Sequence, residues 1–197
     1  AANVPYYRSI QSEEKISVSS IWKKKRNARD NFQIGLVADI YNVNFSDSVR
    51  SSETAYFRIL ANSGGTMALI RSFGQFQHKF KNSIKATAGL HFQYSSMNNE
   101  IASEPRLGLS IPAGKGSVNF GFGMHSQLQP KASYFLEYYD QNDNSYTKTN
   151  LDLGFLRSMH FVAGYDFLSN KNLRIKLETY YQHLYRVPIK ESFPEFS

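Results

Sequence analysis

Apolar and polar residues alternate along most of this chain, and the alternation restricts the folds that it can adopt. In the segment NLRIKLETYYQHLY, residues 172–185, Leu173, Ile175 and Leu177 alternate with charged residues. A period of two residues indicates a β-strand, because successive side chains of a strand point to opposite faces. One face of this strand is apolar and the other is charged. The segment therefore predicts a sheet that separates two different environments.

Eight alternating segments pair into four hairpins across the short polar turns KKRNARD, KNS, AGKG and SNKN. Such turns supply the Gly and Asn residues that hairpins use where φ is positive. Short turns alternate with longer links at residues 44–65, 96–103 and 129–156, as in outer-membrane barrels. We predict an all-β chain, an antiparallel meander that forms eight strands of a transmembrane β-barrel. The predicted hairpins pair 14–23 with 31–43, 66–80 with 83–95, 104–112 with 117–128, and 157–168 with 173–187.

The environment of the apolar face decides between a soluble sheet and a membrane barrel, since both show alternation. In the six clearest segments the apolar face carries no charged residue, whereas the other face carries several. Each uninterrupted run is about 9–11 residues long, the length of a tilted strand that crosses a bilayer. A shift of one residue in the last segment would place Arg174 and Lys176 in lipid, at ~2–4 kcal/mol each near the midplane. These features favour the barrel, and a soluble β-rich binding domain is the alternative.

Composition excludes several other classes of protein. The mean hydropathy is −0.46 and no apolar run approaches the length of a membrane helix. Aromatic residues make up 15% of the chain, as expected where aromatic girdles lie at membrane interfaces. The net charge of +7 comes largely from the run WKKKRNARD, which we interpret as a hydrated turn. No basic helix or RNA-binding signature is present, so we expect no nucleic-acid partner. The absence of cysteine excludes disulfides and cysteine–zinc sites.

Four sequence runs resemble a known family. They are EPRLGLS (104–110), GMHSQLQP (123–130), SMHFVAGYDF (158–167) and NLRIKLETYYQHLYRVPI (172–189). In this order they resemble the barrel of TonB-dependent outer-membrane receptors of Bacteroidota, of the branch with a carboxypeptidase-regulatory-like extension. The resemblance implies a 22-stranded barrel that surrounds an N-terminal plug and imports a nutrient with energy from the inner-membrane TonB complex. It further implies contact with outer-membrane lipid and, as an additional partner, a surface lipoprotein.

The chain departs from the family pattern in three ways. It contains no plug and no TonB box, eight strands are about a third of such a wall, and the end VPIKESFPEFS does not read as a final membrane strand. We therefore expect an internal barrel fragment with a leading loop at 1–13, a wall segment at 14–189 and a trailing loop at 190–197. A small complete eight-stranded outer-membrane barrel is the structural alternative. A receptor-like scaffold for partner proteins is the functional alternative.

The polar face supplies the candidate site residues. No GxSxG, HExxH or paired-carboxylate pattern occurs, so we expect neither an enzyme nor a cofactor. Histidines on this face suit a metal contact or a polar wall hydrogen-bonded to water or plug, and we assign no metal site. The loop 134–150, rich in tyrosine, suits contact with sugars, peptides or partners but is also ordinary for an exposed loop. The lumen-facing candidates for plug or substrate contact are His91, Arg106, His125, His160, Arg174, Lys176 and Glu178.

The spacing of two histidines permits a geometric prediction. His125 and His160 lie eight and nine residues from their short turns, on consecutive predicted strands of the same face. Neighbouring strands are ~4.8 Å apart. We therefore predict that the two imidazoles face the same side and lie within reach of each other.

Overall fold

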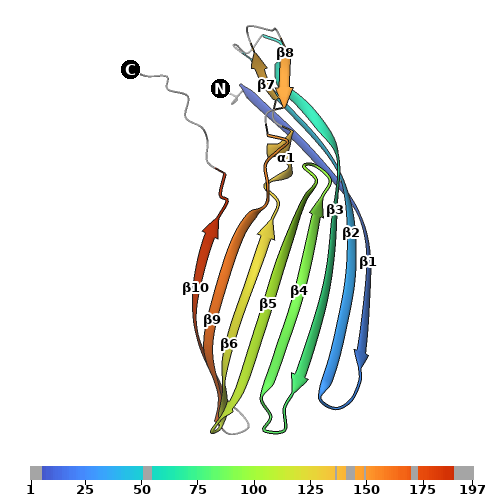
Figure 1. Cartoon of the computed structure of the whole chain (residues 1–197). Helices are drawn as coiled ribbons and strands as arrows, with labels where there is room; N and C mark the ends of the chain where they lie inside the picture. The colour runs from blue at the N-terminus through green and yellow to red at the C-terminus, as the bar shows by residue number, and fades with distance from the viewer. Residues whose placement is uncertain are drawn as a thin grey trace.

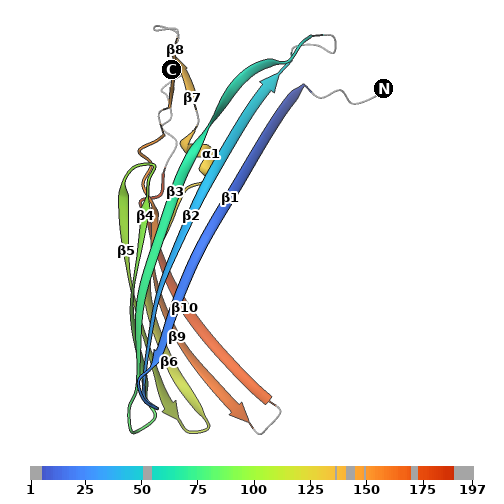
Figure 2. The ribbon, with the colours of Figure 1, turned by 90° about the vertical axis from the view of Figure 1, so that its right-hand side faces the viewer.

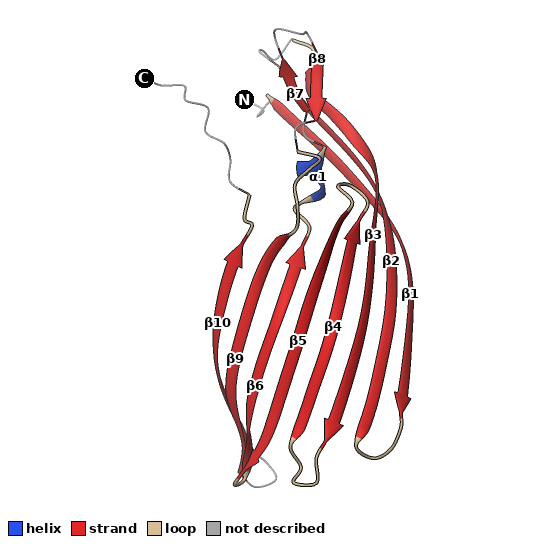
Figure 3. Ribbon diagram, viewed as in Figure 1, coloured by secondary structure: helices blue, strands red, loops and turns tan. Residues whose placement is uncertain are grey.

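The computed structural model describes residues 6–50, 55–135, 137–140, 145–148, 150–169 and 173–188, and these residues form an all-β chain. Eight strands make one antiparallel sheet in the order β1-β2-β3-β4-β5-β6-β9-β10, and β7 and β8 form a separate hairpin. Figures 1 and 3 show this meander with one short helix, α1, near the end of the sheet that carries the long connections. The elements are β1 (Tyr7–Lys25), β2 (Asp30–Val49), β3 (Arg58–Lys79), β4 (Lys85–Ser95), β5 (Glu100–Ala113), β6 (Gly116–Gln127), α1 (Lys131–Tyr134), β7 (Glu137–Asp140), β8 (Ser145–Lys148), β9 (Leu156–Ser169) and β10 (Leu173–Tyr185).

The eight predicted strands and their antiparallel order are confirmed. Every strand pairs with its neighbour along the chain, except that β6 pairs with β9 across the segment that contains α1 and the β7–β8 hairpin. Among the described residues, β1 pairs only with β2 and β10 only with β9, so the sheet is not closed. Figure 2 shows the sheet in profile as a curved wall. These open edges are consistent with the expectation of an internal fragment of a larger barrel.

Three predicted boundaries are wrong. Residues 7–13, assigned to a leading loop, belong to β1 because they continue its register against β2, from Tyr7 opposite Val49. The predicted link 44–65 shrinks to residues 50–57, since β2 and β3 stay paired beyond their apolar bands with one irregularity at Asp47 and Ser48. The link predicted at 96–103 is a tight connection, because β5 begins at Glu100. The trailing loop expected at 190–197 lies outside the described residues.

The sheet has two chemically distinct faces, which we name by the curvature of the wall. The inner face contains Asp39, Arg71 and Glu104, and α1 packs against this side. The outer face contains the apolar residues of alternate parity, such as Leu36 and Leu177, which are 51% and 72% exposed. No described element covers the outer face. The alternation read from the sequence therefore separates two faces of one wall.

The polarity of the outer face changes at a single row of paired residues. Glu14 of β1 lies opposite Asn42 of β2, which lies opposite Thr66 of β3. The next row toward the short turns contains Ile16 and Ile40, both at least half exposed. Beyond this row β2 continues with Asn and Ser on the outer face. The apolar band of β1–β3 thus ends well before the strands do.

The buried core lies on the inner face beyond that same row. Here the inner side of β2 and β3 becomes apolar and is covered by α1 and the residue that follows it. Phe135 sits directly over Gly65, where a Cβ atom would come within 2.5 Å of its ring, so a larger residue would force the ring to move. Burial raises the pKa of the Tyr134 phenol above its ordinary value, which keeps the group neutral. The cluster comprises Tyr41, Val43, Met67, Leu69, Ala102, Tyr134, Phe135 and Phe155.

Candidate functional site

A buried carboxylate joins the first three strands on the inner face. Asp39 of β2 is 1% exposed and lies beside Lys15 of β1, whose Nζ atom is 3.2 Å from Oδ2. The Ser17 hydroxyl donates to Oδ1 over 2.6 Å, and the Arg71 guanidinium of β3 donates to Oδ2. A buried charge is tolerated only when it is paired and hydrogen-bonded, and Asp39 meets both conditions. This carboxylate therefore holds β1, β2 and β3 in register.

A second buried carboxylate does the same for the next three strands. Glu104 of β5 is 1% exposed; its Oε2 atom lies 2.8 Å from Nδ1 of His91 and accepts a hydrogen bond from Arg106 Nη2 over 2.8 Å. Its Oε1 atom accepts from the Ser126 backbone N–H of β6 over 2.7 Å and from the Gln93 amide of β4. Both oxygens are thus satisfied from three strands. Such a fully satisfied network fixes the side chains around it.

The two histidines predicted to be neighbours are found in contact. His125 of β6 and His160 of β9 share the inner face, with ring centroids 4.8 Å apart in an edge-on arrangement. Arg106 Nη2 lies 3.3 Å from His125 Nδ1, and the Ser158 hydroxyl lies 2.8 Å from His160 Nε2. Because a guanidinium only donates, Nδ1 of His125 must accept, and the proton of the neutral ring then lies on Nε2.

The charged candidates on β10 form a separate group closer to the short turn. Arg174 Nε donates to Asp166 Oδ1 over 2.8 Å, and Lys176 Nζ lies 2.7 Å from Glu178 Oε1. These side chains are about half exposed or more, apart from that of Asp166. The Arg174–Asp166 pair joins β9 to β10, whereas Lys176 and Glu178 both belong to β10. Within the described part of the chain, none of these side chains is hydrogen-bonded or ion-paired to His125 or His160. We therefore separate them from the candidate site.

The structure brings together four of the seven sequence candidates, namely His91, Arg106, His125 and His160. The carboxylate that links them, Glu104, was not singled out from the sequence, although it has the same strand parity as Arg106 two residues later. Arg71 was missed because the alternation in 66–80 is poor. Nothing in the sequence pattern indicated that the long link would fold back over this group.

A cavity of about 560 Å³ lies between the histidine group and the segment that leads into α1. Its walls come from the inner faces of β2–β6 and from residues 126–131. Polar side chains dominate, with Leu69 and Leu128 among the apolar part of the lining. The remaining lining residues are Tyr41, Arg71, His91, Gln93, Glu104, Arg106, His125, Ser126, Gln127, Gln129, Pro130 and Lys131.

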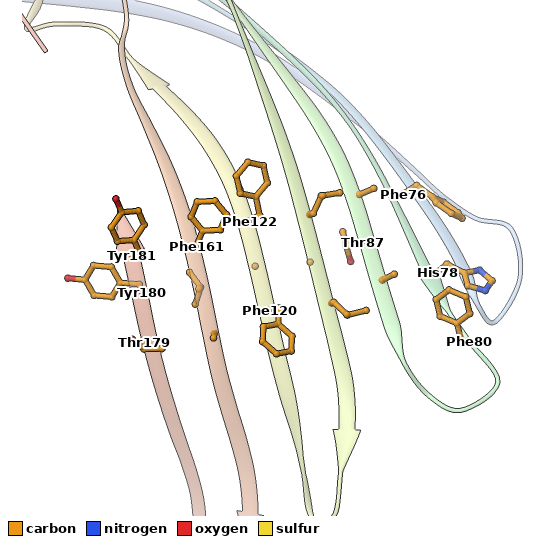
Figure 4. A pocket seen from close by; sticks show the side chains of 18 residues that line it. Phe76, His78, Phe80, Thr87, Phe120, Phe122, Phe161, Thr179, Tyr180 and Tyr181 are labelled. Carbon is orange, nitrogen blue, oxygen red and sulfur yellow. The ribbon is translucent and has the colours of Figure 1, made fainter. Parts of the chain in front are cut away.

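A larger groove of about 790 Å³ is almost entirely apolar. Most of its lining residues belong to the outer face, and Figure 4 shows Phe120, Phe122 and Phe161 on one side with Phe76 and Phe80 across from them. Phe122 and Phe161 are 5.0 Å apart between ring centroids. The groove is a depression in the apolar band and has no cluster of polar groups that would orient a ligand.

The described residues contain no group of three or more His, Asp or Glu side chains arranged to hold a metal ion. They also include no helix with the length and hydropathy needed to span a membrane. Comparison with protein-family models and with curated proteins finds no match to this chain.

Proposed function

We propose that this chain is part of the wall of an outer-membrane β-barrel, with lipid on the outer face and a water-filled, plugged lumen on the inner face. In this proposal the protein is a TonB-dependent importer and not an enzyme, and the inner face forms part of the path of a nutrient. The four sequence runs that resemble this receptor family support the transport part. Strands beyond β1 and β10 would complete the barrel.

One observation carries the membrane part of the proposal. The outer face holds an uncovered apolar band that ends on β1–β3 at the row Glu14, Asn42 and Thr66, and the residues on the same face beyond it are mostly polar. A soluble sheet exposes one polar face to water and buries its apolar face under another layer. Here no described element covers Leu36, Ile175 or their neighbours. Lipid is the solvent that suits such a band.

Spin labels at adjacent positions of β10 test which solvent each face meets. Single cysteines replace Ile175 and Leu177 on the outer face and Lys176 and Glu178 on the inner face, and the chain has no native cysteine that would interfere. In native membranes we expect the outer labels to collide mainly with dissolved oxygen and to be shielded from a water-soluble nickel chelate. Equal access of the chelate to both sets of labels contradicts the proposal.

Transport is tested separately by comparing cells that contain the intact protein with cells that lack it. We expect depletion of at least one nutrient from the medium to require both the protein and the proton gradient that energises TonB. A scaffold role predicts depletion that is independent of that gradient. Depletion that is independent of the proton gradient would contradict the importer assignment, but it would leave the membrane assignment in place.

A further inference from the structure

We propose that the 560 Å³ cavity on the inner face binds the carboxylate of a small organic molecule. The inference rests on the proposed function and deepens it, because it names a class of molecule that the inner face takes. The volume lies within the range of ~300–1,000 Å³ that small-molecule sites occupy. Leu69 and Leu128 form an apolar part of the lining that suits the body of such a molecule, and the polar part of the lining suits its charged group.

The balance of charge around the cavity favours a monoanion. Among the described residues, four cationic side chains stand at or beside its wall and three carboxylates pair with them, which leaves an excess of one positive charge. Lys15 and Arg71 share a single carboxylate, and this sharing produces the excess. The pairs are Lys15 and Arg71 with Asp39, Arg106 with Glu104, and Lys131 with Glu13.

The hydrogen-bonding groups at the wall are mostly donors. Arg71 Nε and Gln129 Nε2 are buried and have no hydrogen-bond partner among the described residues. Both side chains line the cavity. His125 adds a third donor, because the contact with Arg106 leaves the proton of its neutral ring on Nε2. Buried donors without acceptors cost free energy, and an oxygen anion that reached them would remove that cost.

The one carboxylate in the cavity lining, Glu104, is already occupied, which argues against a cation. Glu104 accepts from Gln93, Arg106 and the Ser126 backbone, and His91 lies against it. A bound cation would have to displace these contacts. A carboxylate instead offers two acceptor oxygens and one negative charge, and arginine recognises it with charge-assisted hydrogen bonds. Phosphate carries more charge than the single excess positive charge matches.

The test uses the full-length protein that contains this chain, purified in detergent, and three probes. Benzoate and benzamide have nearly the same shape but differ in charge, and inorganic phosphate is an anion without an apolar body. By calorimetry we expect benzoate to bind at least tenfold more tightly than either of the others, and less tightly as salt concentration rises. Equal binding of benzoate and benzamide, or tighter binding of phosphate, overturns the proposal.

Two variants locate the binding. Gln129→Leu removes an unpartnered donor outside the sheet, and Arg106→Gln removes a half-exposed cation while leaving Glu104 with its other partners. We expect each to weaken benzoate binding about tenfold or more, the loss typical of one hydrogen bond to a charged group. Gln182→Leu on the inner face of β10 is the matched control and should leave binding unchanged. Unaltered binding in both test variants, with circular dichroism unchanged, refutes the assignment.

The outcome is independent of the transport assay. Because the binding measurement uses purified protein, it requires neither a membrane potential nor the TonB complex. Benzoate binding without nutrient import would contradict the importer assignment and support the carboxylate site. Nutrient import without benzoate binding would support the importer assignment and contradict the carboxylate site.

Discussion

Two buried carboxylates organise the inner face of the sheet. Asp39 and Glu104 are each 1% exposed, and each joins three strands through its hydrogen bonds or ion pairs. Backbone hydrogen bonds already join neighbouring strands, but they form equally well in a register that is shifted along the strand. The carboxylates and their partners favour one register, because only that register brings them together. Removing the carboxylate from such a group leaves its buried donors unpaired, and this is the costly way to break a network.

Glu104→Gln is expected to lower the free energy of unfolding by ~1–3 kcal/mol, because the neutral amide accepts fewer of the bonds from His91, Arg106 and Ser126. The measurement is urea unfolding of the protein in lipid vesicles, followed by tryptophan fluorescence. Glu178→Gln is the control, because its ion pair with Lys176 is about half exposed and should be worth less than ~1 kcal/mol. A cost at Glu178 equal to that at Glu104 would contradict this account.

The strands β1–β3 are the elements in which the environment changes along the chain. Each is far longer than a membrane crossing requires, at 19, 20 and 22 residues. Their outer face is apolar up to Ile16 and Ile40 and mostly polar from Glu14 and Asn42 onward, with Ile10 of β1 as an exposed exception. On the opposite side the inner face of β2 and β3 turns apolar over the same stretch and packs against α1. The polarity of the two faces of β2 and β3 therefore reverses at the boundary, so that each strand lies in two different environments.

An arginine scan along the outer face of β2 tests that boundary. Leu36→Arg places a charge inside the apolar band and is expected to cost ~2–4 kcal/mol of stability in lipid. Asn44→Arg has the same parity and strand but lies beyond the boundary row, and its cost should be near zero. Unfolding in vesicles of defined lipid gives both values. Similar costs at the two positions would mean that the band does not end at Asn42.

Much of the fold follows from the sequence at the level of elements, because strand alternation is a local pattern. The four hairpins and the shared face of His125 and His160 follow directly from parity and distance to the turns. The strand extensions beyond the band were missed because their polarity reverses, which reads locally as a loop. The cavity was missed because α1 reaches β2 across the sheet, and no local pattern encodes such a contact.

At the scale of the whole molecule, the described sheet has two free edges. Neither β1 nor β10 pairs on its second side with any described residue. Unpaired backbone groups cannot face lipid, so in a membrane these edges must be covered by further strands. A direct pairing of β1 with β10 would instead close a small barrel.

Paired cysteines distinguish these arrangements in the membrane. Ser19→Cys with Val37→Cys joins residues that lie opposite each other in β1 and β2 and should form a disulfide on mild oxidation. Ser19→Cys with Glu178→Cys, or with Gln182→Cys, should remain reduced within one chain, since β1 and β10 lie at opposite ends of the sheet. Formation of either of these bonds at the rate of the β1–β2 pair would establish the closed eight-stranded barrel. The readout is electrophoretic mobility without reducing agent.

The pairing of β6 with β9 gives this wall an order of assembly. Every other pair of neighbouring strands is joined by a short connection, so these hairpins can zip together one after another. The β6–β9 pair forms only after residues 128–155 have closed into a loop that holds α1 and the β7–β8 hairpin. Loop closure costs only about 0.6 kcal/mol more for each doubling of length, so the inserted segment weighs little on final stability. The inserted segment instead slows the pairing of β6 with β9. We expect the six strands β1–β6 and the hairpin β9–β10 to form as two blocks that pair in a later step.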